Sequence, residues 1–111
     1  MLVEVIVPLP LDMAFTYEGA DDLRVGECVV VPLGKTKVMT GVVRRIDVQA
    51  PEGIEVKQIR ERLNIRYDEQ QIALWEFVAA YYCAPIGEVY RAAVPAWMIS
   101  RDGDRIHINR R

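Results

Sequence analysis

The residues best suited to chemistry in this 111-residue sequence form a short basic turn, Gly34-Lys35-Thr36-Lys37. A glycine lets a ligand come close to the backbone, and two ammonium groups and a hydroxyl stand beside it. This combination suits an anionic ligand such as a phosphate. Apolar, β-branched runs precede and follow the turn, so we expect it to be the tip of a β-hairpin within residues 25–43.

Gly34-Lys35-Thr36 also resembles the end of a phosphate-binding P-loop, but the rest of that motif is missing. A P-loop has the pattern G-x-x-x-x-G-K-[ST] and then opens a helix, so that backbone N–H groups surround the phosphate. Here Val29 occupies the position of the first glycine, and the residues after Thr36 have strand character. The sequence therefore excludes nucleotide hydrolysis at this turn.

Basic residues are concentrated in the middle of the chain, although the formal net charge is −2. Residues 1–34 hold one base and six acids (net −5), residues 35–66 eight bases and four acids (net +4), and residues 67–111 five bases and six acids (net −1). The slightly acidic total argues against a general coat for nucleic acid. The basic segment fits either an anion-binding surface or an ordinary solvated face. Its bases are Lys35, Lys37, Arg44, Arg45, Lys57, Arg60, Arg62 and Arg66.

Short strand-like runs separated by proline and glycine predict a mainly β fold with some helix. These runs cover residues 2–7, 15–18, 29–31, 38–48 and 54–62. Pro8 and Pro10 end the first run, because proline cannot donate to a strand ladder. We expect an α+β fold, a small, curled, antiparallel β-barrel of the OB type, packed against one C-terminal helix and a shorter helix.

The expected long helix begins after Tyr67. Asp68 is a suitable N-cap, and Gln71 completes a capping-box pattern. The helix should end near Cys83, since Pro85 follows, and a short helix over residues 86–93 should end before Pro95. At helical spacing, the aromatic side chains of this region favour core packing over base stacking. They are Trp75, Phe77, Tyr81 and Tyr82.

The remaining features predict one domain over residues 1–98, with a polar tail or linker over residues 99–111. Cys28 and Cys83 lie far apart with no neighbouring histidine, which predicts buried thiols rather than a zinc site or a disulfide. His107 stands alone in the tail, and no nucleophile–base pair is present, so we expect no enzyme activity from this chain. The sequence also has no signal-peptide pattern and no run of apolar residues that could span a membrane, which predicts a cytosolic protein.

Several motifs follow one another in a specific order: V-x-V-P-L-P-L, F-T-Y-E, V-G-x-x-V-x-V-P-L-G-K, G-V-V and Y-Y-x-x-P-I-G-E-V. Together they resemble the N-terminal domain of the family of primosomal protein N′, the bacterial replication-restart helicase PriA. The resemblance extends from residue 3 to about residue 95. It implies a DNA-binding domain, indifferent to base identity, that caps the 3′ end of the nascent leading strand at a stalled fork.

The resemblance also implies a setting for the domain. The partners would be forked or single-stranded DNA, the helicase domains of the same parent chain, other primosome proteins and single-strand-binding protein, but no membrane. The location would be the bacterial cytoplasm, in association with the nucleoid. No cofactor is implied for this chain, because ATP and zinc would belong to later parts of a much longer protein.

The resemblance places the pocket for the terminal nucleotide at Phe15, Thr16, Gly34 and Lys57. Lys35 and Lys37 would make secondary contacts to the DNA backbone. The commoner family pattern is F-D-Y, in which the aspartate would accept a hydrogen bond from the 3′-OH. Because Thr16 offers only a neutral acceptor, we expect 3′-end binding with a reduced preference for a hydroxyl over a 3′-phosphate.

A protein-interaction or scaffolding module of the same helicase, without direct DNA contact, is the alternative. The two readings differ in their response to salt. Contact with phosphates predicts binding that weakens steeply as salt is added and that is lost on Lys57→Ala, whereas scaffolding predicts neither.

Overall fold

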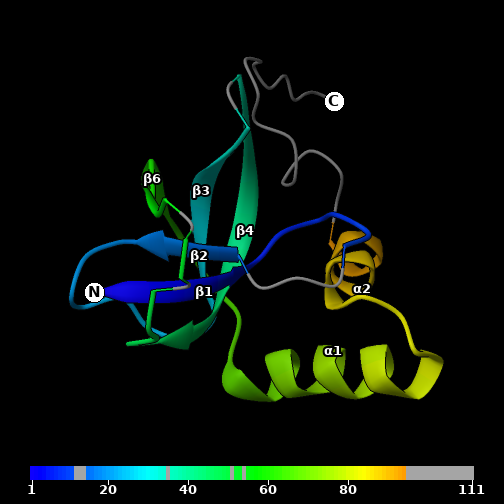
Figure 1. The fold of residues 1–111 in the computed structure, drawn as a ribbon. Helices are drawn as coiled ribbons and strands as arrows, with labels where there is room; N and C mark the ends of the chain where they lie inside the picture. Colours follow the sequence, from blue (N-terminus) through cyan, green and yellow to red (C-terminus); the bar gives the residue numbers. More distant parts are fainter. Residues whose placement is uncertain (12–14, 35, 51, 54, 95–111) are drawn as a thin grey trace, which may run out of the picture.

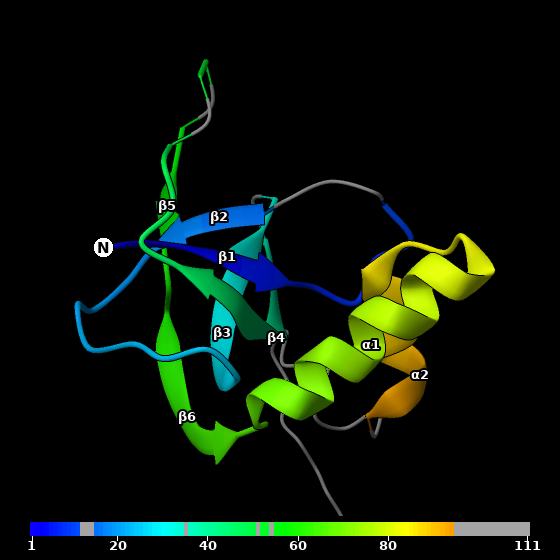
Figure 2. The same cartoon turned by 90° about the horizontal axis from the view of Figure 1, so that it is seen from below.

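The computed structural model describes residues 1–11, 15–34, 36–50, 52–53 and 55–94. Its strands are β1 (Leu2–Ile6), β2 (Phe15–Glu18), β3 (Glu27–Leu33), β4 (Lys37–Ile46), β5 (Lys57–Gln58) and β6 (Glu61–Arg66), and its helices are α1 (Glu69–Tyr82) and α2 (Ile86–Ala93). Both helices lie on one side of the strands (Figure 1, Figure 2). Within these residues, no helix has the length and apolarity needed to cross a membrane. The expected domain boundary at residue 98 and the tail over residues 99–111 lie outside the described residues.

The six strands form one sheet that curls until its two edges are linked. The strand order is β5-β2-β1-β4-β3-β6, so β5 and β6 lie at opposite edges although only Ile59 and Arg60 separate them in sequence. The amide of Ile59 donates to Glu18 O in β2 (2.9 Å), and the amide of Arg60 donates to Val30 O in β3 (2.8 Å). The expected curled, barrel-like α+β fold is confirmed. One detail differs, because β5 pairs with β2 in parallel.

The strand boundaries differ from the sequence prediction in two places. The run expected over residues 54–62 is divided between β5 and β6, because Ile59 and Arg60 turn from one sheet edge to the other. In addition, β3 extends over Pro32 to Leu33, whereas the strand-like run predicted from the sequence ends at residue 31. Val30 O points away from β4 and accepts a hydrogen bond from the amide of Arg60. Pro32 is two residues further along β3, so its nitrogen faces the same side, where no ladder with β4 needs an N–H donor.

The central strands are buried on both faces, which explains their continuous valines. Inside the barrel, one apolar cluster consists of Val3, Val5, Val7, Tyr17, Leu23, Val29, Val31 and Val43. Between the sheet and the helices, a second cluster consists of Ile6, Cys28, Val42, Ile72, Trp75, Tyr90 and Val94. Successive residues of a strand face opposite sides, so β3 and β4 contribute to both clusters. The barrel side of the sheet is the side that carries Tyr17.

The helices begin and end close to the predicted positions. Asp68 is the N-cap of α1 and accepts a hydrogen bond from the amide of Gln71 (2.8 Å), and Cys83 ends the helix in a left-handed conformation with φ 54°. Among the aromatic residues of α1, only Trp75 is in the core. The prediction of core packing is wrong for the other three, whose exposed fractions are 66% for Phe77, 70% for Tyr81 and 71% for Tyr82. Cys83 is also exposed, whereas Cys28 is buried as expected.

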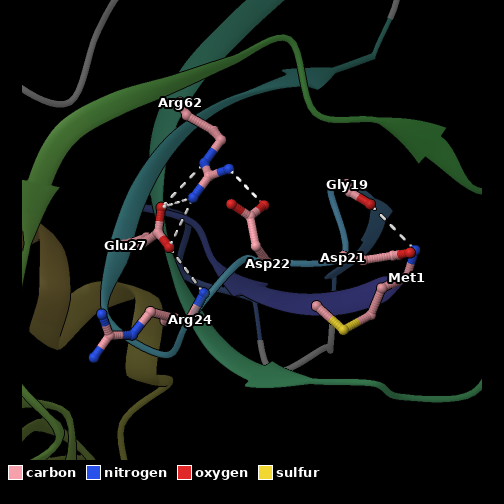
Figure 3. Close-up of polar contacts among 7 residues, drawn as sticks. All are labelled: Met1, Gly19, Asp21, Asp22, Arg24, Glu27 and Arg62. Atoms are coloured by element: carbon pink, nitrogen blue, oxygen red, sulfur yellow. Dashed lines mark hydrogen bonds and ion pairs between the residues drawn. The ribbon is translucent and has the colours of Figure 1, made fainter.

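A charged network closes the barrel end at which β3 begins (Figure 3). The Glu27 carboxylate, which is nearly buried, accepts hydrogen bonds from Arg62 Nε (3.2 Å) and Nη2 (2.9 Å) and from the amide of Arg24 (2.9 Å). Arg62 Nη1 also donates to Asp22 (2.8 Å). These bonds fix edge strand β6 to β3 and to the preceding loop. The opposite end of the barrel, at the β3–β4 turn, is bordered by β5.

Candidate nucleic-acid interface

An open groove of about 640 Å³ lies at the end of the barrel where β3 turns into β4. Pro32 and Gly34 line one side, and residues 56–60 line the other. We call it the rim groove. Its volume is within the range of about 300–1,000 Å³ that is typical of small-ligand sites. The segment that closes the barrel between β5 and β6 therefore also forms a wall of this groove.

Two of the residues expected in the pocket, Gly34 and Lys57, meet directly in the rim groove. Lys57 Nζ donates to Gly34 O over 2.9 Å, although the two residues are far apart in sequence. An ammonium group has three N–H donors, so the bond to Gly34 leaves two for another acceptor. The structure thus places a cation and an exposed turn glycine side by side.

The backbone of Gly34 has a left-handed conformation, with φ 70°. A Cβ atom built on it would meet no other atom within 4 Å among the described residues. Protein packing therefore does not require a glycine here, but the dihedral angle favours one. The missing side chain also leaves open space in front of the turn, where a ligand can approach the backbone.

Ion pairs divide the basic segment into a neutralised part and a free part. Arg44 pairs with Glu4 and Glu76, Arg45 with Glu4, and Arg62 with Glu27 and Asp22. Within the described ranges, by contrast, the side chains of Lys37 and Arg60 have no hydrogen-bond or ion-pair partner. Arg60 lines the rim groove, and Lys37 lies at the start of β4, just after the turn. Unpaired positive charge is therefore present at the groove, although Arg66, whose Nε donates to Val25 O, also has no ion pair among the described residues and lies at the other end of β6. Lys35 lies outside the described residues.

Phe15 is half-buried at the start of β2 and packs against the barrel cluster, as do Leu33 and Ile59. Of these three residues only Ile59 lines the rim groove, whereas Phe15 lines a separate, small hollow with Leu11 and Ile86. Phe15 therefore has a structural role in the barrel core. The exposed part of the ring is what a ligand could contact.

Thr16 lies apart from the other three expected residues. Phe15 and Tyr17 pack inside the barrel, so strand alternation puts the side chain of Thr16 on the outer face. There it is registered with Glu4 of β1, whose carboxylate binds Arg44 and Arg45. No hydrogen bond joins Thr16 to Gly34 or Lys57 in the described structure.

Tyr17 is a groove-side residue that the sequence did not point to. Its hydroxyl donates to Pro32 O over 2.8 Å inside the barrel, and burial raises its pKa to about 12. The hydroxyl therefore stays protonated and remains a donor at neutral pH. Arg60 was likewise counted among the bases but not assigned to the pocket. The bond of its amide to Val30 O in β3, a contact that has no sequence signature, brings it to the groove that Gly34 also lines.

Comparison with protein families matches residues 4–95 to the family model for the 3′ DNA-binding domain (3′BD) of PriA. The chain belongs to this family. The matched range includes every residue that lines the rim groove, together with Phe15 and Thr16. A comparison with curated proteins finds no match. The part of the chain described by the structure has no cluster of three or more potential metal ligands.

Proposed function

We propose that the rim groove binds the 3′-terminal nucleotide of a DNA strand, whatever its base. The observation that carries the proposal is the meeting of Lys57 with Gly34 in a groove bordered by the unpaired Arg60, in a member of the PriA 3′BD family. A strand end is an anionic group with a small sugar beyond its last phosphate. It needs cations beside a surface that allows close approach, and both are present here.

The roles of the side chains follow from their places in the groove. Lys57 and Arg60 would neutralise the last phosphates, and Lys37 would contact the backbone further along the strand. Gly34 would let the sugar approach the turn. The role of Phe15 rests on the family resemblance, because Phe15 does not line the groove: the exposed part of its ring would offer an apolar wall, and a base stacked on it would gain about 1–3 kcal/mol. These groups address phosphate, sugar and ring faces, so base identity would not affect binding.

The domain would act as the end-sensing part of a replication-restart helicase, capping the nascent leading strand at a stalled fork. The helicase domains of the same parent chain, other primosome proteins and single-strand-binding protein would be its protein partners. The helicase domains, not this one, would use ATP and zinc, and the setting would be the bacterial cytoplasm. The support for this wider role is the family of the chain.

Salt dependence tests the proposal. Anisotropy of a labelled single strand, titrated at several salt concentrations, should give an affinity that falls linearly on a log–log plot, with a slope of about 0.7 per phosphate contacted. Lys57→Ala and Arg60→Ala should each weaken binding and reduce the slope by about one contact.

Arg24→Ala is the matched control for these variants. Its guanidinium has no partner among the described side chains (Figure 3). Arg24 precedes β3, at the barrel end opposite the rim groove. Arg24→Ala removes one positive charge, as the other two variants do, but away from the groove. It should therefore leave the slope of the salt dependence nearly unchanged. Equal effects of all three variants would mean that only the net charge of the protein matters, and would refute a groove-specific site.

Protein docking is a second candidate function, and one observation favours it. Leu74, Phe77 and Tyr81 form an exposed apolar strip along α1, on the side away from the core residues Ile72 and Trp75. The ring centroids of Phe77 and Tyr81 are 6.1 Å apart in a stacked arrangement. If this strip serves a protein partner, replacing Phe77 and Tyr81 by serine will leave DNA affinity unchanged. A loss of DNA affinity would instead make the strip part of the DNA site.

A further inference from the structure

We infer that Tyr17 is the positioning residue of the rim groove, an inference that rests on the proposed function. Tyr17 is connected to both walls of the groove. It is the registered partner of Lys57 on β5, and its hydroxyl holds Pro32, two residues before Gly34. A single side chain thus links the two walls of the groove through the inside of the barrel.

The carbonyl of Pro32 has no strand partner on the edge that Tyr17 reaches. The pairing of β6 with β3 extends only as far as Val30 in the described register. Val30 O accepts the amide of Arg60, and Pro32 O, two residues further on, points to the same side beyond the last paired residue. The buried hydroxyl of Tyr17 supplies the missing donor at 2.8 Å. Without it, a buried carbonyl would lack a hydrogen bond.

The hydrogen bond from Tyr17 to Pro32 O also fixes the position of the β3–β4 turn relative to β5. Tyr17 is 5% exposed, so its ring is held by the barrel core and its hydroxyl has little freedom. The bond from Lys57 to Gly34 O is exposed to solvent and comes from a long and flexible side chain. The hydrogen bond from Tyr17 to Pro32 O is therefore the rigid contact that holds the turn. Lys57 can release Gly34 O and bind a phosphate instead. Tyr17 itself would not touch DNA.

Tyr17→Phe tests this role, because it removes one hydroxyl and keeps the ring. Tyr90→Phe is the matched control. The Tyr90 hydroxyl also donates to a backbone carbonyl, Thr40 O, over 2.8 Å and is fully buried, but Tyr90 lies on α2 in the cluster between sheet and helices. Both variants should be destabilised to a similar extent. Only Tyr17→Phe should lower the affinity for a single strand with a free 3′ end, by about five- to tenfold.

The affinity for the same strand with a bulky 3′ block should change little in either variant, so the preference for the free end should shrink in Tyr17→Phe alone. In the absence of DNA, the NMR order parameter of the Gly34 amide should fall in Tyr17→Phe and stay unchanged in Tyr90→Phe. Equal order parameters in both variants, or a loosened turn with unchanged end preference, would overturn the inference. If the unmodified protein shows no preference for a free end, the proposed function fails, while the Gly34 order parameter still decides whether Tyr17 anchors the turn.

Discussion

Replacing Gly34 by alanine separates the two reasons for a glycine at the β3–β4 turn. The φ of 70° makes alanine unfavourable by about 1–2 kcal/mol, whatever the surroundings. Because no described atom lies within 4 Å of the added methyl group, packing contributes nothing further. The methyl group would project into the open space of the rim groove, where the proposed ligand approaches. We expect it to lower affinity for a 3′ end by at least about tenfold, or about 1.4 kcal/mol.

Gly53 provides the control, because it has the same backbone strain without the groove. Its φ is 75°, and a Cβ there also meets no described atom within 4 Å. Urea unfolding should show the same loss of stability for Gly34→Ala and Gly53→Ala, and anisotropy should show a loss of DNA affinity only for Gly34→Ala. If Gly34→Ala binds a 3′ end as tightly as the unmodified protein, the approach of the ligand to the turn is refuted. Equal losses of affinity in both variants would refute it too.

Three further predictions concern Thr16, the reactivity of the two cysteines, and the pH dependence of stability that follows from Cys28 and Tyr17. Because Thr16 lies on the outer face of β2 and does not line the rim groove, Thr16→Asp should leave the preference for a 3′-OH over a 3′-phosphate unchanged in competition titrations, at a stability cost of about 0.2–1 kcal/mol from the facing Glu4; a sharpened preference would place position 16 in end recognition. In the native protein a thiol reagent at neutral pH should modify the exposed Cys83 and spare the buried Cys28, and both should react after unfolding; rapid modification of two thiols in the native state would contradict the fold. Burial, aided by Glu27, raises the pKa of Cys28 from 9.0 to about 11, and burial raises that of Tyr17 from 10.0 to about 12. The unfolded chain therefore loses these protons first, and the urea midpoint should fall as pH rises from about 9 to about 12; a midpoint that is constant over this range would contradict both shifts.

The architecture could be predicted because its signals are local. Capping by Asp68, the proline and glycine that follow α1, and the β-branched runs of β3 and β4 each act within a few residues. The closure of the barrel could not be predicted in the same way. It depends on Ile59 and Arg60 bonding to two distant strands, and no periodicity of the sequence encodes that pairing.

The candidate site was predictable only in part, for a similar reason. The family resemblance pointed to Gly34 and Lys57, and the fold brings them within hydrogen-bonding distance. The contribution of Arg60 and the anchoring by Tyr17 depend on which strand pairs with which. The prediction that all four aromatic residues of α1 pack in the core was wrong, because helical spacing shows which residues share a face but not which face packs against the sheet. Trp75 faces the sheet, whereas Phe77 and Tyr81 lie on the exposed side.

The central claim is that the rim groove recognises a strand end, and one titration tests it most directly. Fluorescence anisotropy would compare a labelled single strand that has a free 3′-OH with the same strand carrying a bulky group on its 3′ end. A clear preference for the free end, which is lost in Gly34→Ala and kept in Gly53→Ala, is the predicted result. Equal binding to both strands would contradict the claim, because it would show that a basic surface, rather than a pocket for the terminus, holds the DNA.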